Sequence, residues 1–180
     1  MTSLSPSFNF NMKAIMACDA SYGIGIHNQL PNWKLKNDLK LFKELTIGNG
    51  NNVVIMGKNT WVSIGEKPLL NRMNFVLSSQ YVPKKDTNVC FFQRYEDIIN
   101  ELRRTYYHTI WIIGGSQIYD LFIEQCNTIY LSQTIKKFEC TTFLSQKCIS
   151  AFTNKNKTIS IVQYQKEGDG YDAYKKYICS

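Results

Sequence analysis

The sequence predicts a single-domain α/β protein with a central, mostly parallel twisted sheet, helices on both faces and an antiparallel C-terminal edge strand. From residue 13 to residue 134, apolar segments of strand length alternate with helical patterns, which favours strand–helix–strand units and a parallel sheet. After residue 135 this alternation stops. Two strand-like segments, 158–164 and 173–178, then flank the turn sequence KEGDG, which predicts an antiparallel hairpin.

The individual elements follow from short local patterns. The VVIM segment is continuously apolar and largely β-branched, which is typical of a buried central strand. Three of the expected strands are followed directly by a residue that ends regular structure, at Gly57, Ser78 and Gly114. The expected strands before the hairpin are 13–18, 53–56, 74–77, 88–92, 109–113 and 128–134. The expected helices are 34–46, 58–64, 95–106 and 116–124.

Length and composition limit the class of protein. A chain of 180 residues with 44% apolar residues fits one domain that buries roughly 70% of its unfolded surface. We expect residues 1–12 to be a short N-terminal extension and residues 13–180 to be the domain. No apolar run is long enough to span a membrane, and the first residues lack the pattern of a signal peptide, which favours a cytoplasmic protein.

The cysteines and the charge exclude further classes. The six cysteines form no CxxC pair and do not cluster with the two histidines, so we expect no metal site and free thiols in a reducing compartment. The net charge of +7 is moderate, and the basic residues form no run longer than a pair. This charge suits small polyanionic ligands at least as well as nucleic acid.

One acid lies on the apolar side of the helix expected at 34–46. The apolar stripe of that helix consists of Leu35, Leu39, Phe42 and Thr46. Asp38 falls inside this stripe, and a carboxylate that faces a core is costly unless something pairs with it. Asp38 is therefore a candidate functional acid. The alternative is a first-turn acid that complements the helix dipole.

Three strand ends carry groups suited to phosphate. They hold Gly57, Lys58, Asn59 and Thr60 at the first end, Ser78 and Ser79 at the second, and Gly114, Gly115, Ser116 and Gln117 at the third. Ligands of open α/β sheets bind beyond the carboxyl ends of the strands, and exposed amides at helix starts bind phosphate. Singly, each end could be a plain turn or a solvated surface, and no GxGxxG is present. Together they predict a dinucleotide site.

These motifs resemble the dihydrofolate reductase family. The matching pieces are Ala17, Ile24, Gly25, Leu30, Pro31, Trp33, Leu35 and Asp38, then VIMGKNTWVSI at 54–64, PLLNRMNFVLSS at 68–79, IIGGSQIY at 112–119 and YLSQT at 130–134. They run in family order over roughly residues 13–143. The resemblance implies the dihydrofolate-reductase-like fold and NADPH-dependent reduction of 7,8-dihydrofolate to 5,6,7,8-tetrahydrofolate for one-carbon metabolism. In that reaction hydride goes to C6 and a proton to N5.

The resemblance also implies the substrate residues. Asp38 would bind the 2-amino group and N3 of the pterin at the floor of the pocket, and Trp33 would hold an ordered water nearby. Arg72 would pair with the α-carboxylate of the glutamate tail. Ser132, where the family usually has threonine, would hydrogen-bond Asp38. The walls of the pocket would be Ile15, Leu30, Leu39, Phe42, Ile64 and Ile113. Core packing is the alternative role for each of these wall residues.

The cofactor residues are implied in the same way. NADPH would be held at its adenosine phosphates by Lys58, Asn59, Thr60, Ser78 and Ser79, with Arg94 a weaker candidate for the 2′-phosphate. Its diphosphate would lie against Gly114, Gly115, Ser116, Gln117 and Ile118, and its nicotinamide near Tyr119, Ala17, Ile24 and Gly25. The loop at 23–29 would be a lid whose opening could limit turnover.

The chain departs from the family pattern near the lid. Asn32 is an extra residue before Trp33, and in FECTTFLS the family's acid and proline are replaced by Thr141 and Ser145. Two other functions stay open: a non-catalytic nucleotide or RNA binder on this fold, and a related pteridine or pyrimidine reductase. Arg72 favours a substrate with a carboxylate tail. We expect a monomer that binds dihydrofolate and antifolate inhibitors, without nucleic acid or a membrane.

Overall fold

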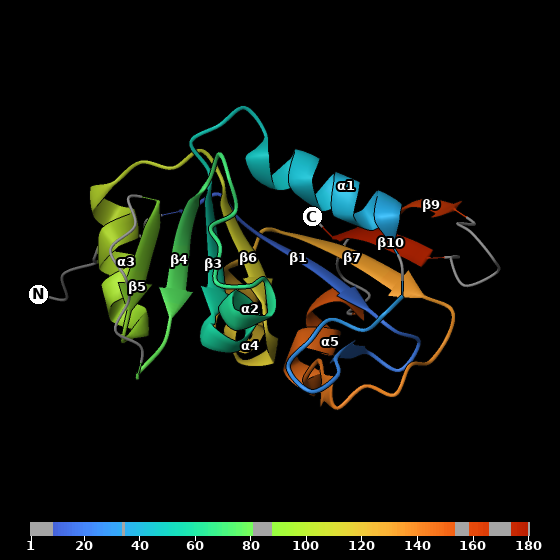
Figure 1. The fold of residues 1–180 in the computed structure, drawn as a ribbon. Coiled ribbons are helices and arrows are strands. Elements are labelled where there is room, and N and C mark those ends of the chain that lie inside the picture. Colours follow the sequence, from blue (N-terminus) through green and yellow to red (C-terminus); the bar gives the residue numbers. More distant parts are fainter. Residues whose placement is uncertain (1–8, 34, 81–87, 154–158, 166–173, 180) are drawn as a thin grey trace, which may run out of the picture.

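An eight-stranded sheet runs through the molecule in the order β5-β4-β3-β6-β1-β7-β10-β9 (Figure 1). The computed structural model describes residues 9–33, 35–80, 88–153, 159–165 and 174–179. The strands are β1 (Met12–Cys18), β3 (Val53–Gly57), β4 (Met73–Leu77), β5 (Val89–Phe92), β6 (Ile110–Gly114), β7 (Thr128–Thr134), β9 (Ile159–Gln165) and β10 (Tyr174–Cys179). The six neighbouring strands from β5 to β7 in this order are parallel to one another. β10 pairs antiparallel with β7, and β9 pairs antiparallel with β10. The predicted fold class is confirmed.

Helices cover both faces of this sheet. They are α1 (Lys36–Ile47), α2 (Lys58–Ser63), α3 (Tyr95–Arg104), α4 (Ser116–Phe122), the 3₁₀ turn η1 (Ile123–Gln125) and α5 (Gln146–Thr153). On one face, α3, α4 and α5 contribute Ile98, Phe122 and Phe152 to the larger core cluster. On the other face, α1 and α2 contribute Phe42 and Trp61 to a second cluster. Because both faces are covered, the central strands are apolar throughout.

Three short elements were not predicted from the sequence. β2 (Gly23–Gly25) and β8 (Thr142–Phe143) pair with each other in a separate two-stranded sheet. Elements this short carry no measurable periodicity. The third is α5, whose start does have a local signal, because the Ser145 hydroxyl accepts the N–H of Cys148 at 3.1 Å, as an N-cap does.

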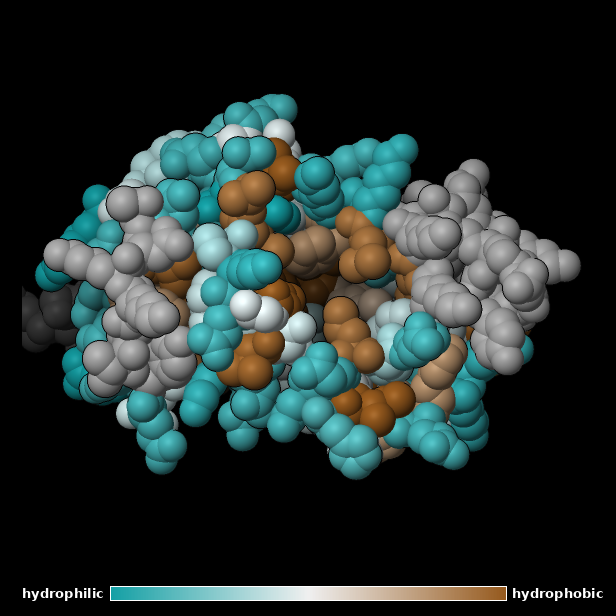
Figure 2. Space-filling view, in the orientation of Figure 1, coloured by the Kyte–Doolittle hydropathy of each residue, from teal (hydrophilic) through white to brown (hydrophobic). Residues whose placement is uncertain are grey.

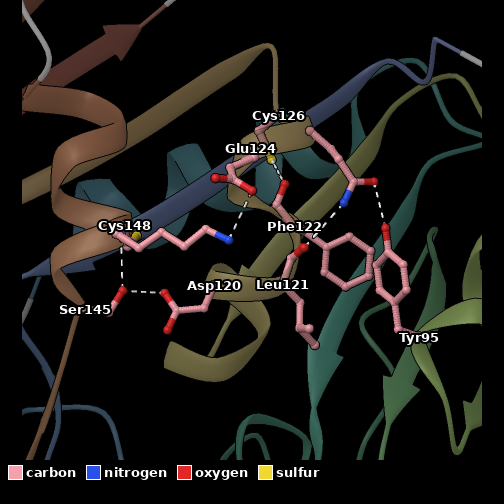
Figure 3. A network of polar contacts seen from close by, with 10 residues as sticks. Tyr95, Asp120, Leu121, Phe122, Glu124, Cys126, Ser145 and Cys148 are labelled. Atoms are coloured by element: carbon pink, nitrogen blue, oxygen red, sulfur yellow. Dashed lines mark hydrogen bonds and ion pairs between the residues drawn. The ribbon is translucent and has the colours of Figure 1, made fainter. Parts of the chain in front are cut away.

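Polar contacts attach α5 to α4 and η1 (Figure 3). The hydroxyl of Ser145 donates to the Asp120 carboxylate, and the Lys147 ammonium lies 3.1 Å from a carboxylate oxygen of Glu124. The Lys147–Glu124 pair is largely exposed, so it contributes little to stability. Ser145, which replaces the family's proline, therefore both caps α5 and links it to α4.

The apolar stripe predicted on α1 faces the core only in part. Leu35 and Thr46 are buried, but Leu39 is 61% exposed. The prediction that the stripe packs on the core is therefore wrong at Leu39. Periodicity places a side chain on a face of the helix, whereas the position of the helix over the sheet decides how far along its length that face is covered.

Within the described residues, no helix has the length and apolar character needed to cross a membrane. The same residues contain no group of three or more metal-binding side chains. Within the described part of the chain, five cysteines are outside any disulfide: Cys18, Cys90, Cys126, Cys140 and Cys148. Burial raises the pKa of the Cys148 thiol to about 12, so this thiol stays protonated at neutral pH.

Replacement of Phe75 tests the core under the sheet. Its fully buried ring lies 4.8 Å from the ring of Phe92 and 5.7 Å from that of Tyr107. Phe75→Ala should lower the free energy of unfolding by about 3–5 kcal/mol through the lost burial and the cavity left behind. Urea denaturation measures the change. Tyr106→Ala, at a side chain that is 75% exposed, is the matched control and should change it by less than about 0.5 kcal/mol. Equal losses would contradict the assigned core.

Candidate active site

Three strand ends predicted to hold a ligand lie side by side. β4, β3 and β6 are consecutive parallel neighbours in the sheet, so their carboxyl ends meet at one edge. Gly57 ends β3, Ser78 directly follows β4, and Gly114 ends β6. The sheet topology thus brings together three segments that are far apart in the sequence, at the edge where ligands of α/β proteins bind.

The two glycines after β6 have different spatial roles. Gly114 has a φ of 102°, and a Cβ atom there would lie 2.8 Å from the ring of Tyr119. A Cβ atom on Gly115 would have Thr60 Oγ1, at 3.6 Å, as its nearest neighbour among the described residues. The peptide bond between the two glycines is cis. Gly114 is therefore required by packing, whereas Gly115 keeps open the space between the starts of α2 and α4.

Tyr119 anchors α4 to the centre of the sheet. Its buried hydroxyl donates to the carbonyl oxygen of Ile15 at 2.9 Å. Burial raises the pKa of this hydroxyl well above its ordinary value, so it stays protonated and remains a donor. The hydrogen bond fixes the carbonyl of Ile15, a residue that the resemblance placed in the wall of the pterin pocket.

Asp38 is held against the sheet by a hydrogen bond. It lies in the first turn of α1, half-buried, and its Oδ1 accepts the hydroxyl of Ser132 on β7. Close by in the sequence, Trp33 is buried and its ring meets that of Phe138 edge-on at 5.9 Å, with Ala17 packed against the same cluster. The predicted contact between Ser132 and Asp38 is confirmed, and it orients the carboxylate.

The predicted wall residues fall into two groups. Ile15, Ile113, Phe42 and Ile64 belong to one cluster on the face covered by α1 and α2. Leu30 and Leu39 are each 61% exposed. Figure 2 shows apolar side chains around a hollow on the face that carries α1 and α2. Leu30 and Leu39 are therefore exposed enough to contact a ligand in this hollow, whereas the other four residues pack in the cluster.

Arg72 is buried, and no acid of the described residues forms an ion pair with it. Its side chain is 8% exposed, and burial lowers the pKa of its guanidinium. Nε donates to the carbonyl oxygen of Leu70 at 3.0 Å, Nη1 donates to Thr46 Oγ1 at 2.6 Å, and the group lies 5.9 Å from the centre of the Phe42 ring. Among the side chains that the structure describes, no carboxylate pairs with it. A buried guanidinium that has no carboxylate partner attracts an anionic ligand.

The predicted lid is a hairpin. Ile26 and Gln29 exchange backbone hydrogen bonds of 2.9 Å, and the two residues between them, His27 and Asn28, have φ values of 47° and 63°. Positive φ at both central positions is the signature of a type I′ turn. At its tip, Asn28 Oδ1 accepts from Asn59 Nδ2 of α2 at 3.3 Å. The lid therefore reaches the predicted cofactor side.

Thr141 supports the lid although it replaces the family's acid. Its Oγ1 accepts the N–H of His27 at 2.9 Å, and its own N–H donates to the carbonyl oxygen of Gly25 at 2.8 Å. Next to it, Phe143 O accepts the hydroxyl of Ser116 at 3.0 Å. Thr141 therefore contacts the lid through both its hydroxyl and its backbone N–H.

Asp19 is a structural anchor that the sequence reasoning missed. Its fully buried carboxylate accepts three backbone N–H groups, from Ser21 at 2.7 Å, Gly23 at 2.8 Å and Phe138 at 2.8 Å. It therefore joins the base of the lid to the segment after β7. The available signal was an Asp two residues before a Ser and four before a Gly, a spacing typical of Asx turns.

The remaining cofactor candidates differ in exposure. Ser78 is buried, whereas Lys58, Asn59 and Ser79 are exposed at the same edge of the sheet. Arg94 donates through Nε and Nη2 to the Asp97 carboxylate at 3.1 and 2.8 Å, and these hydrogen bonds lower the pKa of Asp97. Its guanidinium is thus already engaged, which weakens its case as a phosphate ligand.

The fold and the site define an α/β protein with polar segments at the carboxyl edge of a parallel sheet and an oriented acid on the flanking helix α1. The sequence profile of the dihydrofolate reductase family matches residues 11–175. The chain belongs to the dihydrofolate reductase family. This confirms the resemblance.

Similar proteins come from several sources. A bifunctional dihydrofolate reductase-thymidylate synthase of Paramecium tetraurelia is 35% identical over 152 residues, which are 83% of this chain and 31% of that protein. This chain therefore spans about a third of the length of that relative. A putative dihydrofolate reductase of Caenorhabditis elegans is 34% identical over 140 residues, 71% of this chain and 74% of that one.

A solved structure matches closely. Dihydrofolate reductase from Enterococcus faecalis, complexed with NADP(H) and RAB-propyl, superposes with a TM-score of 0.77 at 27% identity and covers 94% of this chain and 96% of its own. The α/β architecture is thus shared over nearly the whole length of both chains.

The two glycines provide a stability test. Gly114→Ala should lower the free energy of unfolding by about 1–3 kcal/mol, because the methyl group overlaps the Tyr119 ring and the backbone is left-handed. Gly115→Ala, the matched control, should change it by less than about 0.5 kcal/mol. Chemical denaturation of both variants measures the difference. A Gly115 variant as unstable as the Gly114 variant would contradict the open space assigned to Gly115.

Proposed function

We propose that this chain reduces 7,8-dihydrofolate to 5,6,7,8-tetrahydrofolate with NADPH and so supplies one-carbon metabolism. Dihydrofolate reductase activity follows from membership of the family. The observation that carries the proposal is the Asp38 carboxylate, which Ser132 orients beside apolar walls while Arg72 lies buried without a carboxylate among the described side chains. A flat cationic or amide-rich ring with an anionic tail complements this set of groups.

Asp38 is the acid that binds and activates the pterin in this proposal. Its carboxylate accepts hydrogen bonds from the 2-amino group and N3, which raises the electron density of the ring and favours protonation at N5. When bound, NADPH supplies the hydride that adds to C6, so one hydride and one proton reduce the C=N bond. Trp33 holds the water through which the proton arrives, and the walls exclude other water from the reaction.

The cofactor residues are proposed from their position at the carboxyl edge of the sheet. Gly115 lacks a side chain where the starts of α2 and α4 approach each other, which leaves room for a diphosphate. The adenosine phosphates lie against Lys58, Asn59, Thr60, Ser78 and Ser79. The diphosphate and nicotinamide lie against Gly114, Ser116, Gln117, Ile118, Tyr119, Ala17, Ile24 and Gly25. The Arg94–Asp97 pair leaves Lys58 as the better partner for the 2′-phosphate.

The substrate tail distinguishes dihydrofolate from other pterins. Leu30, Leu39, Phe42 and Ile64 offer apolar surface to the p-aminobenzoyl group, and Arg72 pairs with the α-carboxylate of the glutamate. A pteridine reductase that acts on tail-less substrates has no use for a buried guanidinium at this place. Antifolate inhibitors would occupy the same pocket.

The organisation of the protein is proposed as well. Residues 13–180 form one domain in this proposal and residues 1–12 an N-terminal extension, although β1 already begins at Met12, which is fully buried. The protein acts as a monomer in the cytoplasm and needs neither nucleic acid nor a membrane. The basic residues form no run longer than a pair, which favours small ligands over nucleic acid.

Replacement of the acid tests the function. Asp38→Asn should lower kcat at neutral pH by about 100-fold or more, because the amide carries no negative charge and presents N–H groups to the pterin. The loss of NADPH absorbance in the presence of dihydrofolate measures the rate. Asp97→Asn, on the exposed surface of α3, is the matched control and should turn over normally. Normal turnover by the Asp38 variant would refute the assigned acid.

Replacement of Gly115 tests the cofactor site. Gly115→Ala should raise the dissociation constant of NADPH by about tenfold, since a methyl group between α2 and α4 overlaps the diphosphate. Binding is followed by quenching of tryptophan fluorescence. The dissociation constant of dihydrofolate in the same variant is the internal control and should not change. An unaltered NADPH affinity would place the diphosphate elsewhere.

A further inference from the structure

We propose that Thr46 is a specificity-determining residue, because its hydroxyl positions the Arg72 guanidinium for the carboxylate tail of the substrate. The inference rests on the proposed function, since it concerns the affinity for a glutamate-bearing pterin. Thr46 lies near the end of α1, and a threonine within an apolar helical stripe has no evident need of its hydroxyl for packing. The contacts of that hydroxyl carry the argument.

The hydroxyl of Thr46 makes two hydrogen bonds at once. It donates to the carbonyl oxygen of Phe42, one turn earlier in α1, at 2.6 Å, and it accepts from Nη1 of Arg72 at 2.6 Å. Because the proton is committed to the helix backbone, a lone pair of the oxygen faces the guanidinium. Thr46 is fully buried, so water has no direct route to replace this oxygen. The Thr46 hydroxyl oxygen is therefore a fixed acceptor for Nη1 of the Arg72 guanidinium.

Two further contacts complete the orientation of Arg72. Nε donates to the carbonyl oxygen of Leu70, and the Phe42 ring lies 5.9 Å from the guanidinium carbon. Guanidinium is planar, so two hydrogen bonds and one ring fix the directions of its remaining N–H groups. Nη2 makes no hydrogen bond to the described residues. Two parallel N–H groups, one on each terminal nitrogen, match the spacing of a carboxylate.

A purely structural role for Thr46 makes a different prediction. The hydrogen bond also joins the end of α1 to the segment before β4, so its loss could loosen the helix as a whole. A loosened α1 would also displace Asp38, and would impair every pterin substrate equally. A positioning role impairs only substrates that carry the carboxylate. The two roles therefore differ in their dependence on the substrate tail.

The experiment compares Thr46→Val with Thr46→Ser on two substrates. Dihydrofolate carries the tail, whereas 6-methyl-7,8-dihydropterin has a similar ring without it. Thr46→Val should raise KM for dihydrofolate about tenfold, the effect of one lost hydrogen bond to a charged group, with kcat changed less than about twofold. KM for the tail-less pterin should stay at the parent value. Thr46→Ser keeps the hydroxyl, so the KM of this variant for dihydrofolate should equal that of the parent chain.

Thr153→Val provides the matched control. The Thr153 hydroxyl donates to the carbonyl oxygen of Ile149 one turn earlier in α5 at 2.9 Å, as Thr46 does in α1, but its side chain is exposed. This variant removes the same kind of intrahelical bond away from Arg72 and should leave both KM values unchanged. In an Arg72→Met background, Thr46→Val should raise KM for dihydrofolate no further, because the group it positions is gone.

The outcomes separate the two proposals. An unchanged KM for dihydrofolate in Thr46→Val, or equal increases for both substrates, overturns the positioning role. So does an additive increase in the Arg72→Met background. If Thr46→Val does not fold, as judged by circular dichroism, the comparison is made with Thr46→Ala, for which the same results support or overturn the role. A parent chain that does not oxidise NADPH with dihydrofolate would instead refute the proposed function.

Discussion

The hydrogen bond from Ser132 to Asp38 is the contact on which the arrangement of the site depends. It joins residues 94 positions apart and attaches the first turn of α1 to β7. A half-buried carboxylate is costly unless it is paired, so this contact restricts how α1 can lie over the sheet. Once the start of the helix is fixed, Leu39 faces the open side and Thr46, two turns later, reaches the buried Arg72. The Ser132–Asp38 hydrogen bond thus helps to place both Asp38 at the start of α1 and Thr46 near its end.

The cofactor side depends on a property of the sheet instead. Because β4, β3 and β6 are parallel neighbours, the segments that follow them must leave the sheet at the same edge. Close packing then distinguishes the glycines: Gly114 admits the Tyr119 ring, and Gly115 leaves space beside Thr60. Tyr119 in turn donates to Ile15 on β1, so the packing of α4 also fixes the backbone on the substrate side. The two halves of the site are therefore mechanically connected through buried groups.

The lid is held at two places by groups with different chemistry. At its base, the Asp19 carboxylate accepts three backbone N–H groups, and at its far side the Thr141 hydroxyl accepts the N–H of His27. The Asp19 side chain accepts three hydrogen bonds, whereas the Thr141 hydroxyl accepts one. The base is therefore the firmer attachment. At the second attachment, Thr141 stands where the resemblance places an acid, and its hydroxyl oxygen accepts the N–H of His27.

The sequence by itself determined the fold class, the principal strands, the polar strand ends and the family. These properties follow from periodicity and from motifs within single segments, which do not depend on how segments meet. Tertiary structure alone decided that Leu39 is exposed, that Arg94 is engaged by Asp97, that Asp19 anchors the lid and that the Thr46 hydroxyl serves Arg72. Even the predicted contact between Ser132 and Asp38 came from resemblance to a family. Local patterns record which face of a segment is apolar. The partner of a polar group on another segment depends on packing angle and register, for which one sequence carries no local signal.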